Sequence, residues 1–182
     1  MTALPAEYLR RIADLHAELG IPRDYARTRG LPIQPEATGL VVIGANPDGR
    51  KVQLTREAAA AWRKLHGGAR SDGIILLAIS GFRSVERQEE IIREKLAAGK
   101  AIGDILRLVA APGHSEHHTG RALDLGTPAQ TTLEERFATT TAFAWLQSRA
   151  GRLGFRLSYP AGNPSGFDYE PWHWCWHPPV AD

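Results

Sequence analysis

Apolar and polar residues alternate along the chain with two different periods, which predict helices and strands. Apolar side chains at helical spacing, with charged residues between them, indicate amphipathic helices. Thr55 and Ser84 stand just before two such segments and are predicted to cap them. The predicted helices span residues 5–19, 56–65, 85–98, 102–108, 133–137 and 141–152.

Short apolar runs bounded by turn residues predict strands. The run over residues 74–80 is continuous, which is typical of a strand buried on both faces. Asp48 and Gly49 lie between residues 40–43 and 51–54, so these two segments are expected to form a hairpin with a longer loop. Further strands are predicted over residues 121–126, 155–158 and 169–176.

The mixture of helices with antiparallel hairpins predicts an α+β fold, with a small antiparallel sheet flanked by helices. A chain of 182 residues is long enough for one domain with a core and too short for two comfortable ones. We therefore expect a single domain over residues 1–182. Within it, residues 1–40 form a helical N-terminal extension and residues 70–177 carry the chemistry.

Composition narrows the classes of function. Lys plus Arg is 22 and Asp plus Glu is 20, and a net charge of +2 argues against a dedicated nucleic-acid binder. No stretch approaches the roughly 20 apolar residues that a membrane helix needs. Charged residues also interrupt the N-terminal windows where a signal peptide carries its apolar region. At face value the chain is expected in the cytoplasm, or in the cell envelope if it is truncated or otherwise exported.

The residues most informative about chemistry are histidines in two clusters near loop or strand ends. The first cluster runs from Ser115 through His117 to Asp124, and the second runs from Glu170 to His177. Imidazole and carboxylate groups together are the usual ligands of zinc. A catalytic zinc takes about three protein ligands and leaves one position open.

The first cluster has a readable geometry. On the predicted strand 121–126, Asp124 faces away from the leucines that can enter the core. Gly120 and Ala122 are small, so the face around Asp124 is expected to stay open for an ion and a substrate. His117 precedes the strand on a loop and can fold back toward Asp124.

The second cluster offers a carboxylate and an imidazole three residues apart. On a regular strand Glu170 and His173 would face opposite ways. Pro171 breaks that regularity, because it fixes its own φ and restricts the residue before it. Both side chains can then converge on one cavity, walled by Trp172 or Trp174.

Spacing alone leaves a metal site and a purely structural interpretation both open. A lone histidine or aspartate at a loop end is usually solvated or caps a turn, and this is the expectation kept for His114, His118 and His177. The aromatic segment 169–176 by itself indicates core packing. Cys175, the single cysteine, excludes an internal disulfide and is interpreted as a small buried hydrophobic residue, neither ligand nor nucleophile.

Three ordered motifs stand out in the chain: Ser80-Gly81-Phe82-Arg83-Ser84 followed by Gln88, Pro112-Gly113-x-Ser115-x-His117-x-x-Gly120-x-Ala122-x-Asp124, and Glu170-x-x-His173. They resemble the motifs of the VanY family of zinc D-alanyl-D-alanine carboxypeptidases. Relatives of that family include VanX-type D,D-dipeptidases, L,D-carboxypeptidases and endolysin peptidases. The motifs span about residues 76–176, and residues 1 to about 40 carry no match. Phe82 departs from a frequent Tyr, and His118 from a common Gln.

The resemblance implies a zinc metallopeptidase with Zn²⁺ as its cofactor. Its zinc ligands would be His117, Asp124 and His173, and its general base would be Glu170. The implied reaction is hydrolysis of the C-terminal D-alanine from peptidoglycan stem peptides.

The resemblance also implies substrate contacts. Arg83 would stabilise the tetrahedral oxyanion or bind the terminal carboxylate of the substrate, since its guanidinium suits either task. Gln88 and Ser115 would bind substrate. Without the resemblance, Arg83 is open to interpretation as a surface ion-pair residue and Gln88 as a solvated helix position.

Several alternatives remain open at this point. The enzyme alternatives are an L,D-carboxypeptidase, a D,D-dipeptidase and a murein endopeptidase of the same family. The alternative from a different class is a catalytically dead zinc-binding domain, against which Glu170 argues because a pseudoenzyme need not keep a base. The expected partners are stem peptides or murein fragments, with neither nucleic acid nor membrane, and the chain is expected to be a monomer.

Overall fold

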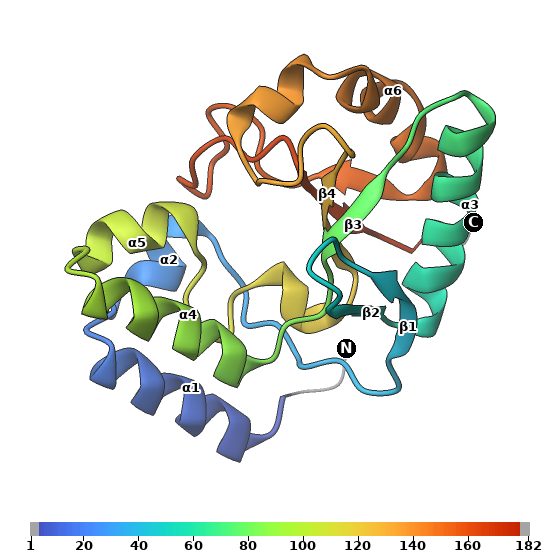
Figure 1. Cartoon of the computed structure of the whole chain (residues 1–182). Helices are drawn as coiled ribbons and strands as arrows, with labels where there is room; N and C mark the ends of the chain where they lie inside the picture. Colours follow the sequence, from blue (N-terminus) through green and yellow to red (C-terminus); the bar gives the residue numbers. More distant parts are fainter. Residues whose placement is uncertain (1–3, 179–182) are drawn as a thin grey trace.

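The computed structural model describes residues 4–178 and confirms the predicted α+β fold, with a small antiparallel sheet flanked by helices (Figure 1). The four strands of this sheet follow the order β3-β4-β6-β5, and every neighbouring pair is antiparallel. A separate hairpin joins β1 to β2 through the predicted Asp-Gly loop. The strands are β1 (Val41–Ala45), β2 (Lys51–Leu54), β3 (Leu77–Ser80), β4 (Ala122–Gly126), β5 (Phe155–Leu157) and β6 (His173–Trp176).

Helices lie on both sides of the sheet. In Figure 1, α1, α2, α4 and α5 gather into one group, and α3 and α6 lie across the sheet from it. Three short 3-10 turns complete the regular structure. The helices are α1 (Ala6–Glu18), α2 (Tyr25–Arg29), α3 (Arg56–Ser71), α4 (Val85–Ala97), α5 (Ile102–Leu108) and α6 (Thr141–Arg149), and the 3-10 turns are η1 (Glu116–Thr119), η2 (Glu135–Thr139) and η3 (Ala150–Leu153).

The main core lies between the sheet and the α3–α6 side. Leu123 and Leu125 enter this core from β4, as the alternation along the strand predicts. They meet Trp62 of α3 and Leu146 of α6, and all four side chains are buried. Burying apolar side chains of this size contributes roughly 1.5–3 kcal/mol each. The face of β4 opposite to this core is therefore the one available for chemistry.

A second, smaller core holds the other helices together. Leu19, Tyr25, Ile92 and Ile105 bring the N-terminal helices onto α4 and α5. Ser84 caps α4 as predicted, because its side chain accepts a hydrogen bond from the backbone N–H of Arg87. We call this second core with its helices the helical lobe, and the sheet with α3 and α6 the sheet lobe.

The N-terminal residues brace the helical lobe. The Glu36 carboxylate accepts a hydrogen bond of 2.6 Å from the backbone N–H of Val85, at the first turn of α4. The Tyr25 hydroxyl accepts a hydrogen bond from the N–H of Ala111, and His16 donates one to the carbonyl of Pro112. These contacts tie the start of the chain to the loop that carries the first histidine cluster. The division into an extension of residues 1–40 and a core of 70–177 stays a prediction.

Two predicted strands are shorter in the structure. The run over residues 74–80 pairs only from Leu77 onward, and none of the four residues of β3 is fully buried. The reason is that β3 is an edge strand with a neighbour on one side only, and Ile75 before it is 59% exposed. The predicted strand 169–176 begins only at His173, because a turn occupies the residues before it.

The helix boundaries also differ from the prediction. The helix that Thr55 caps continues to Ser71, because Gly67 and Gly68 lie within it and Ala69 is again buried against the core. In place of the predicted helix over residues 133–137 the structure has the 3-10 turn η2 (Glu135–Thr139), and the end of 141–152 also tightens into a 3-10 turn. The short helix α2 is absent from the prediction because five residues are too few to display a helical period.

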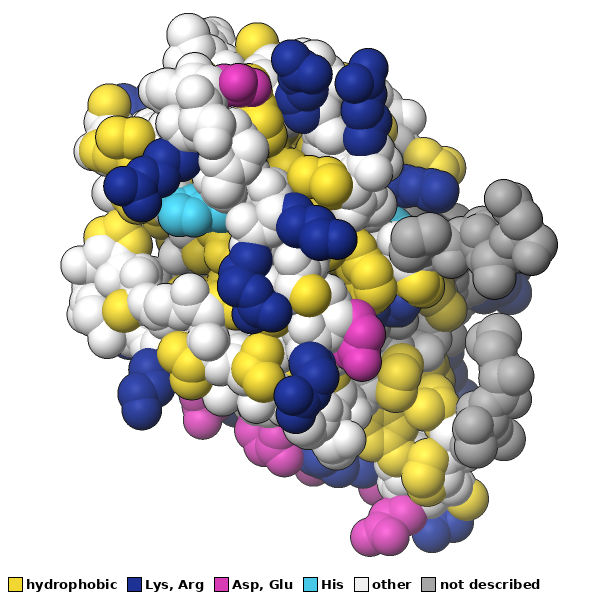
Figure 2. Space-filling model, turned by 90° about the vertical axis from the view of Figure 1, so that its right-hand side faces the viewer, with side chains coloured by type: hydrophobic (Ala, Val, Ile, Leu, Met, Phe, Trp, Pro, Cys, Tyr) yellow, Lys and Arg dark blue, Asp and Glu magenta, His cyan; other side chains and the backbone are white. Residues whose placement is uncertain are grey.

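Over the part of the chain that the structure describes, the face of the molecule that carries α3 has no continuous basic patch (Figure 2). Figure 2 looks onto the side of the molecule that carries α3, where Lys and Arg side chains are scattered among polar and apolar ones and form no continuous stripe. Among the described residues, no helix combines the length and the hydrophobicity that crossing a bilayer requires.

Candidate active site

The pairing of β4 with β6 creates the centre of the site. In this register Asp124 lies directly opposite His173, and on the other side of β4 it lies opposite Ser80. Directly opposed residues of antiparallel strands share a face, so these side chains are neighbours. Asp124 is only 3% exposed, although it carries a charge.

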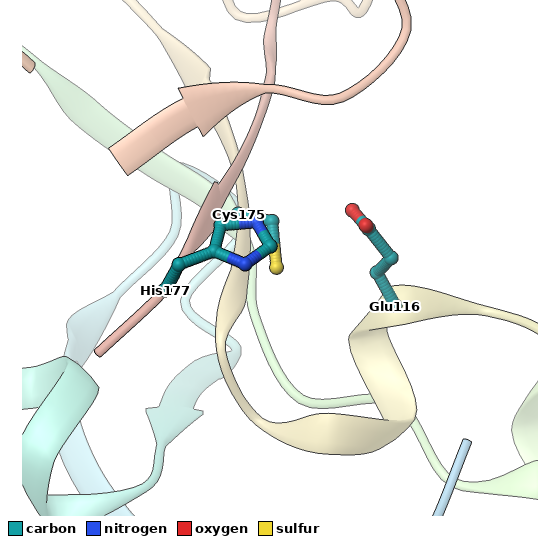
Figure 3. Close-up of side chains that lie close together, drawn as sticks. All are labelled: Glu116, Cys175 and His177. Atoms are coloured by element: carbon teal, nitrogen blue, oxygen red, sulfur yellow. The ribbon is translucent and has the colours of Figure 1, made fainter. Parts of the chain in front are cut away.

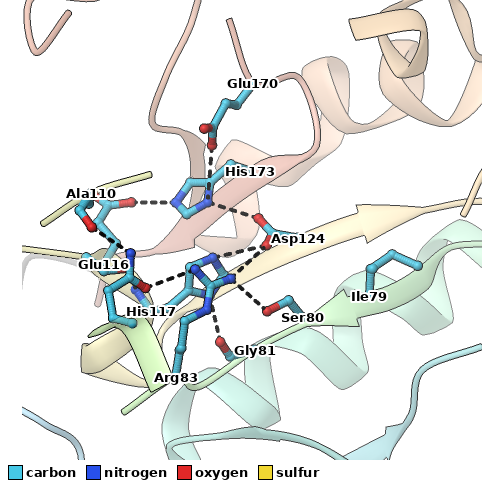
Figure 4. Close-up of polar contacts among 12 residues, drawn as sticks. Ile79, Ser80, Gly81, Arg83, Ala110, Glu116, His117, Asp124, Glu170 and His173 are labelled. Carbon is cyan, nitrogen blue, oxygen red and sulfur yellow. Dashed lines mark hydrogen bonds and ion pairs between the residues drawn. The ribbon is translucent and has the colours of Figure 1, made fainter. Parts of the chain in front are cut away.

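His117 approaches Asp124 from the 3-10 turn η1. The side chain of Ser115 caps this turn by accepting a hydrogen bond from the N–H of His117. The imidazole Nδ1 donates to the carbonyl of Gly81 at 2.6 Å, which leaves Nε2 facing Asp124 Oδ2 at 3.1 Å (Figure 4). A side chain at Gly81 would approach within 2.5 Å of the carbonyl of Gln53, so glycine is required where this carbonyl is presented.

His173 is held by two carboxylates. Its Nδ1 lies 3.1 Å from Asp124 Oδ1, and its Nε2 lies 2.9 Å from Glu116 Oε2. The Ser158 hydroxyl fixes the same Glu116 oxygen. Burial opposes the charged form of His173, but the hydrogen bonds to Asp124 and Glu116 outweigh it and raise its pKa to about 10. Burial alone would raise the pKa of Glu116, but His173 and Ser158 lower it to about 2.

His117, Asp124 and His173 form a cluster that can hold a metal ion. One ligand atom from each lies within 4.8 Å of the other two, and all three residues are buried. Two imidazoles and a carboxylate are a zinc-type donor set, and three protein ligands leave a coordination position for water or substrate. Each histidine also has the hydrogen-bond partner on its other ring nitrogen that metal-binding histidines commonly have. The donors and their orientation therefore fit zinc.

Glu170 lies beside this cluster, outside the strand. The N–H of His173 bonds to the carbonyl of Glu170 in the turn around Pro171, so the two side chains reach the same region. Glu170 Oε2 is 3.9 Å from His173 Nδ1. Burial raises the pKa of Glu170 to about 7, above the usual range of a carboxyl group. A carboxyl group with such a pKa is suited to taking and returning a proton near neutral pH.

Arg83 reaches the cluster from the turn between β3 and α4. Its guanidinium donates to Gln88 Oε1 at 3.0 Å and to Ser80 Oγ at 3.3 Å, and it lies 3.7 Å from Asp124 Oδ2. Gln88 is itself fully buried, and its amide nitrogen donates to the carbonyl of Ala110 at 2.6 Å. Burial lowers the pKa of Arg83 from its ordinary value.

A cavity of about 350 Å³ joins these groups. It lies between the helical lobe and the sheet lobe, with Ser115, His117, Asp124, Glu170 and His173 among its lining residues. Arg83 and Gln88 line it from the helical side. Apolar walls complete it, formed by Ile91, Leu108, Val109, Leu133, Phe167 and Trp172.

All seven residues predicted for the site are thus brought to one cavity. The alternative interpretation of Gln88 as a solvated helix position is wrong, since Gln88 is fully buried and accepts a hydrogen bond from Arg83. Arg83 is not a surface residue either, since its side chain is 19% exposed and directed at Asp124. The roles assigned to these residues remain predictions.

Three other expectations need correction. His114 and His118 are buried rather than solvated. His118 Nδ1 donates to the carbonyl of Arg83, and its Nε2 accepts a hydrogen bond from the N–H of Gly113. Both ring nitrogens therefore link backbone segments, and neither is directed at the His-Asp-His cluster. The small size of Gly120 does not open the site. A side chain there would meet Leu40 and other residues of the sheet lobe and N-terminal segment instead.

Two residues at the site were missed by the sequence analysis. Glu116 orients His173, and the ring of Tyr159 lies 4.8 Å from that of His173 at a tilt of 37°. Glu116 stands between two motif residues, Ser115 and His117, and this position in the sequence indicates that it lies near the site. Tyr159 follows β5 with no local pattern that points to the site.

A buried His-Asp-His cluster with a glutamate beside it, at a cavity of an α+β domain, is the arrangement of a zinc metallopeptidase. A family model described as VanY, D-alanyl-D-alanine carboxypeptidase, matches residues 51–179. The chain belongs to this family, as its motifs predicted.

Known relatives agree with this assignment. The putative carboxypeptidase YodJ of Bacillus subtilis (strain 168) is 35% identical over 127 residues, which cover 68% of this chain and 46% of YodJ. This chain therefore spans under half the length of that relative. A structure of the LdcB LD-carboxypeptidase is 31% identical with a TM-score of 0.70, covering 80% of this chain and 71% of that one.

A second solved structure bears on the cofactor. The vancomycin-resistance D,D-pentapeptidase VanY, solved in complex with Zn(II), is 26% identical with a TM-score of 0.60. The match covers 80% of this chain and 82% of that one. The cluster of His117, Asp124 and His173 and this zinc-bound neighbour support zinc as the cofactor.

The hydrogen bond between Glu116 and His173 predicts a loss of metal affinity. Glu116→Ala removes the partner of His173 Nε2, so we expect zinc to bind roughly 10–100-fold more weakly. Glu116→Gln keeps an acceptor and should lose less. Competition with a chromophoric chelator measures both affinities, with Glu90→Gln on the exposed face of α4 as control. If Glu116→Ala binds zinc as tightly as the wild type, His173 is oriented without this carboxylate.

Proposed function

We propose that this protein is a zinc-dependent carboxypeptidase that removes the C-terminal D-alanine from peptidoglycan stem peptides. The observation that carries the proposal is the position of Glu170, a buried carboxyl group beside the His-Asp-His cluster and at the same cavity as Arg83. One group is thereby available for proton transfer and another for binding an anion. The names of its relatives support the substrate class.

His117, Asp124 and His173 would hold the zinc, through His117 Nε2, a carboxylate oxygen and His173 Nδ1. The other nitrogen of each histidine stays bonded to Gly81 or Glu116. When bound, zinc supplies Lewis acidity, which lowers the pKa of water and polarises a peptide carbonyl.

Glu170 would act as the general base. Its carboxylate takes a proton from the attacking water and returns it to the amine that leaves when the peptide bond breaks. The walls of the cavity, including Trp172 and Phe167, keep the carboxyl group in surroundings where its pKa is raised to about 7. A proton acceptor with this pKa can also give the proton back near neutral pH.

Arg83 would bind the C-terminal carboxylate of the substrate. Its guanidinium is held by the neutral partners Gln88 and Ser80, and its nearest acidic group, Asp124, is 3.7 Å away and would serve as a metal ligand. Arg83 can therefore still form a bidentate pair with a substrate carboxylate. Ser115 and Gln88 line the same cavity and would contact the last residue of the substrate.

An L,D-carboxypeptidase is the second candidate. The similarity to the LdcB LD-carboxypeptidase, with a TM-score of 0.70, favours it. Both candidates cut the last peptide bond, but they differ in the configuration of the residue before it. In either case the expected substrates are stem peptides or murein fragments, and the enzyme is expected to act on them as a monomer.

The products of synthetic stem peptides test the function. With the zinc-loaded protein, we expect mass spectrometry to show loss of one D-alanine from a pentapeptide that ends in D-Ala-D-Ala. Loss from the tetrapeptide alone would identify an L,D-carboxypeptidase, and internal cleavage would identify an endopeptidase. Hydrolysis of free D-Ala-D-Ala to two D-alanines, with the pentapeptide left intact, would identify a D,D-dipeptidase. If every peptide stays intact although zinc is bound, the proposal of an enzyme is wrong.

Glu170→Gln separates chemistry from metal binding. Glu170 is not one of the three ligands, so the variant should keep its zinc, while kcat falls by at least roughly 10²–10⁴-fold because the base is lost. Metal analysis and turnover of the same preparation measure the two effects. Glu134→Gln, on the surface, is the control and should match the wild type. Turnover within a few-fold of wild type would remove Glu170 from the mechanism.

Recognition by Arg83 predicts sensitivity to the substrate's C-terminus. Amidating that carboxylate should cost the wild type about 1.5–3 kcal/mol, or roughly 10- to 150-fold in kcat/KM. Arg83→Ala should lose much less on amidation, because the partner is already absent, and the control Arg87→Ala should behave as wild type. Equal losses in Arg83→Ala and wild type would show that Arg83 does not read the carboxylate.

A further inference from the structure

A second group of potential metal ligands lies on the other side of His173 from the cavity. Side chains two apart on an extended segment share a face, so Cys175 and His177 continue the face on which His173 lies. Figure 3 shows Cys175 and His177 together, with the carboxylate of Glu116 directed toward them from η1. Ala122 lies opposite Cys175 in the β4–β6 register and is too small to fill this face.

The three side chains lie close enough together to share one ion. One ligand atom each from Glu116, Cys175 and His177 lies within 4.8 Å of the other two. The hydrogen bonds of Glu116 to His173 and Ser158 both use Oε2. Oε1 is therefore available as a ligand.

The group is separate from the cavity and is reached from a different side. Neither Glu116, Cys175 nor His177 lines the cavity that contains Glu170 and Arg83. Cys175 is buried, while Glu116 and His177 are partly exposed. Two of the three side chains are therefore in contact with solvent.

From the sequence, neither Cys175 nor His177 is expected to be a metal ligand, and their grouping in the structure revises that expectation. We infer that Glu116, Cys175 and His177 form a second metal site, selective for a thiophilic divalent cation such as zinc. Thiolate, imidazole and carboxylate are all established zinc ligands, and three of them leave a fourth position for water. Arg156 lies opposite Cys175 across β5 and β6, and Arg121 is also close to the cluster. Their positive charges disfavour a hard cation held by charge alone, whereas a soft cation gains a metal–sulfur bond.

The second site shares one carboxylate with the first. Glu116 binds His173 through Oε2 and would bind the second ion through Oε1, so that ion would further restrict the group that orients His173. The inference rests on the residues of this group and does not require that the chain be a peptidase.

Cobalt(II) is the probe that distinguishes the two sites. The first cluster contains no sulfur, so the near-ultraviolet charge-transfer band of a cobalt–thiolate bond reports only the second site. On the full chain with its cysteine kept reduced, we expect two equivalents of cobalt per chain and this band. Cys175→Ala and His177→Ala should each lose one equivalent, the first variant with complete loss of the band. His66→Ala, on the surface of α3, should match the wild type.

His117→Ala keeps the two conclusions apart. It should lose the equivalent of the first site yet retain the band, whether or not the protein hydrolyses peptides. Circular dichroism and thermal melting of each variant establish that it is folded, and His177→Ala supplies the test should Cys175→Ala fail to fold. Binding of only one equivalent without the band, or two equivalents without it, overturns the inference, as does an unchanged band in folded His177→Ala.

Discussion

Asp124 is a charged carboxylate buried in the middle of a sheet, and much of the structure depends on how that charge is stabilised. Isolated, a buried carboxylate would be strongly destabilising or would take up a proton. Burial alone would raise its pKa, but His117 and His173 outweigh that effect and hold the pKa of Asp124 well below its usual range. Arg83 adds positive charge 3.7 Å away. The groups that stabilise the carboxylate are the same ones that define the cavity.

The partners of Asp124 are in turn fixed by more distant groups. His117 is held by the carbonyl of Gly81, and His173 by Glu116, which Ser158 fixes. Ring orientation is thereby determined before any ion binds, which reduces the reorganisation that binding requires. This explains why a short 3-10 turn, a glycine and the end of β5 matter to a site whose ligands are three other residues.

The resemblance of the three motifs identified the ligands, and only part of their arrangement is local, since His173 stands 49 positions from Asp124. The Ser-x-His…Asp spacing spans a turn and the strand that follows it. Pro171 indicated that the backbone before His173 is irregular. The contact between Glu116 and His173 joins positions 57 apart, and no local pattern in the sequence predicts it. The burial of Gln88 was missed for the same reason, because α4 is amphipathic by itself and only the packing of the lobes covers that position.

The fold class was predictable from alternation and turn residues, but strand limits were not. Apolar content predicted a strand over residues 74–80, whereas strand length is decided by which residues find a pairing partner, and β3 has only β4. The final aromatic segment was likewise too long in the prediction. Its first residues form the turn that presents Glu170, so the departure from regular structure lies where the site needs a carboxyl group.

The two lobes contribute different groups to the site. The metal-type ligands lie on or beside β4 and β6, in the middle of the sheet, where strand pairing fixes their separation. Arg83 and Gln88 come from the turn before α4 and from α4 itself and line the same cavity, where Arg83 also reaches Ser80 and Asp124 of the sheet. Changes on the helical lobe can therefore alter which peptide is bound while the ligand geometry is kept. This separation is consistent with one family that contains D,D- and LD-carboxypeptidases on the same fold.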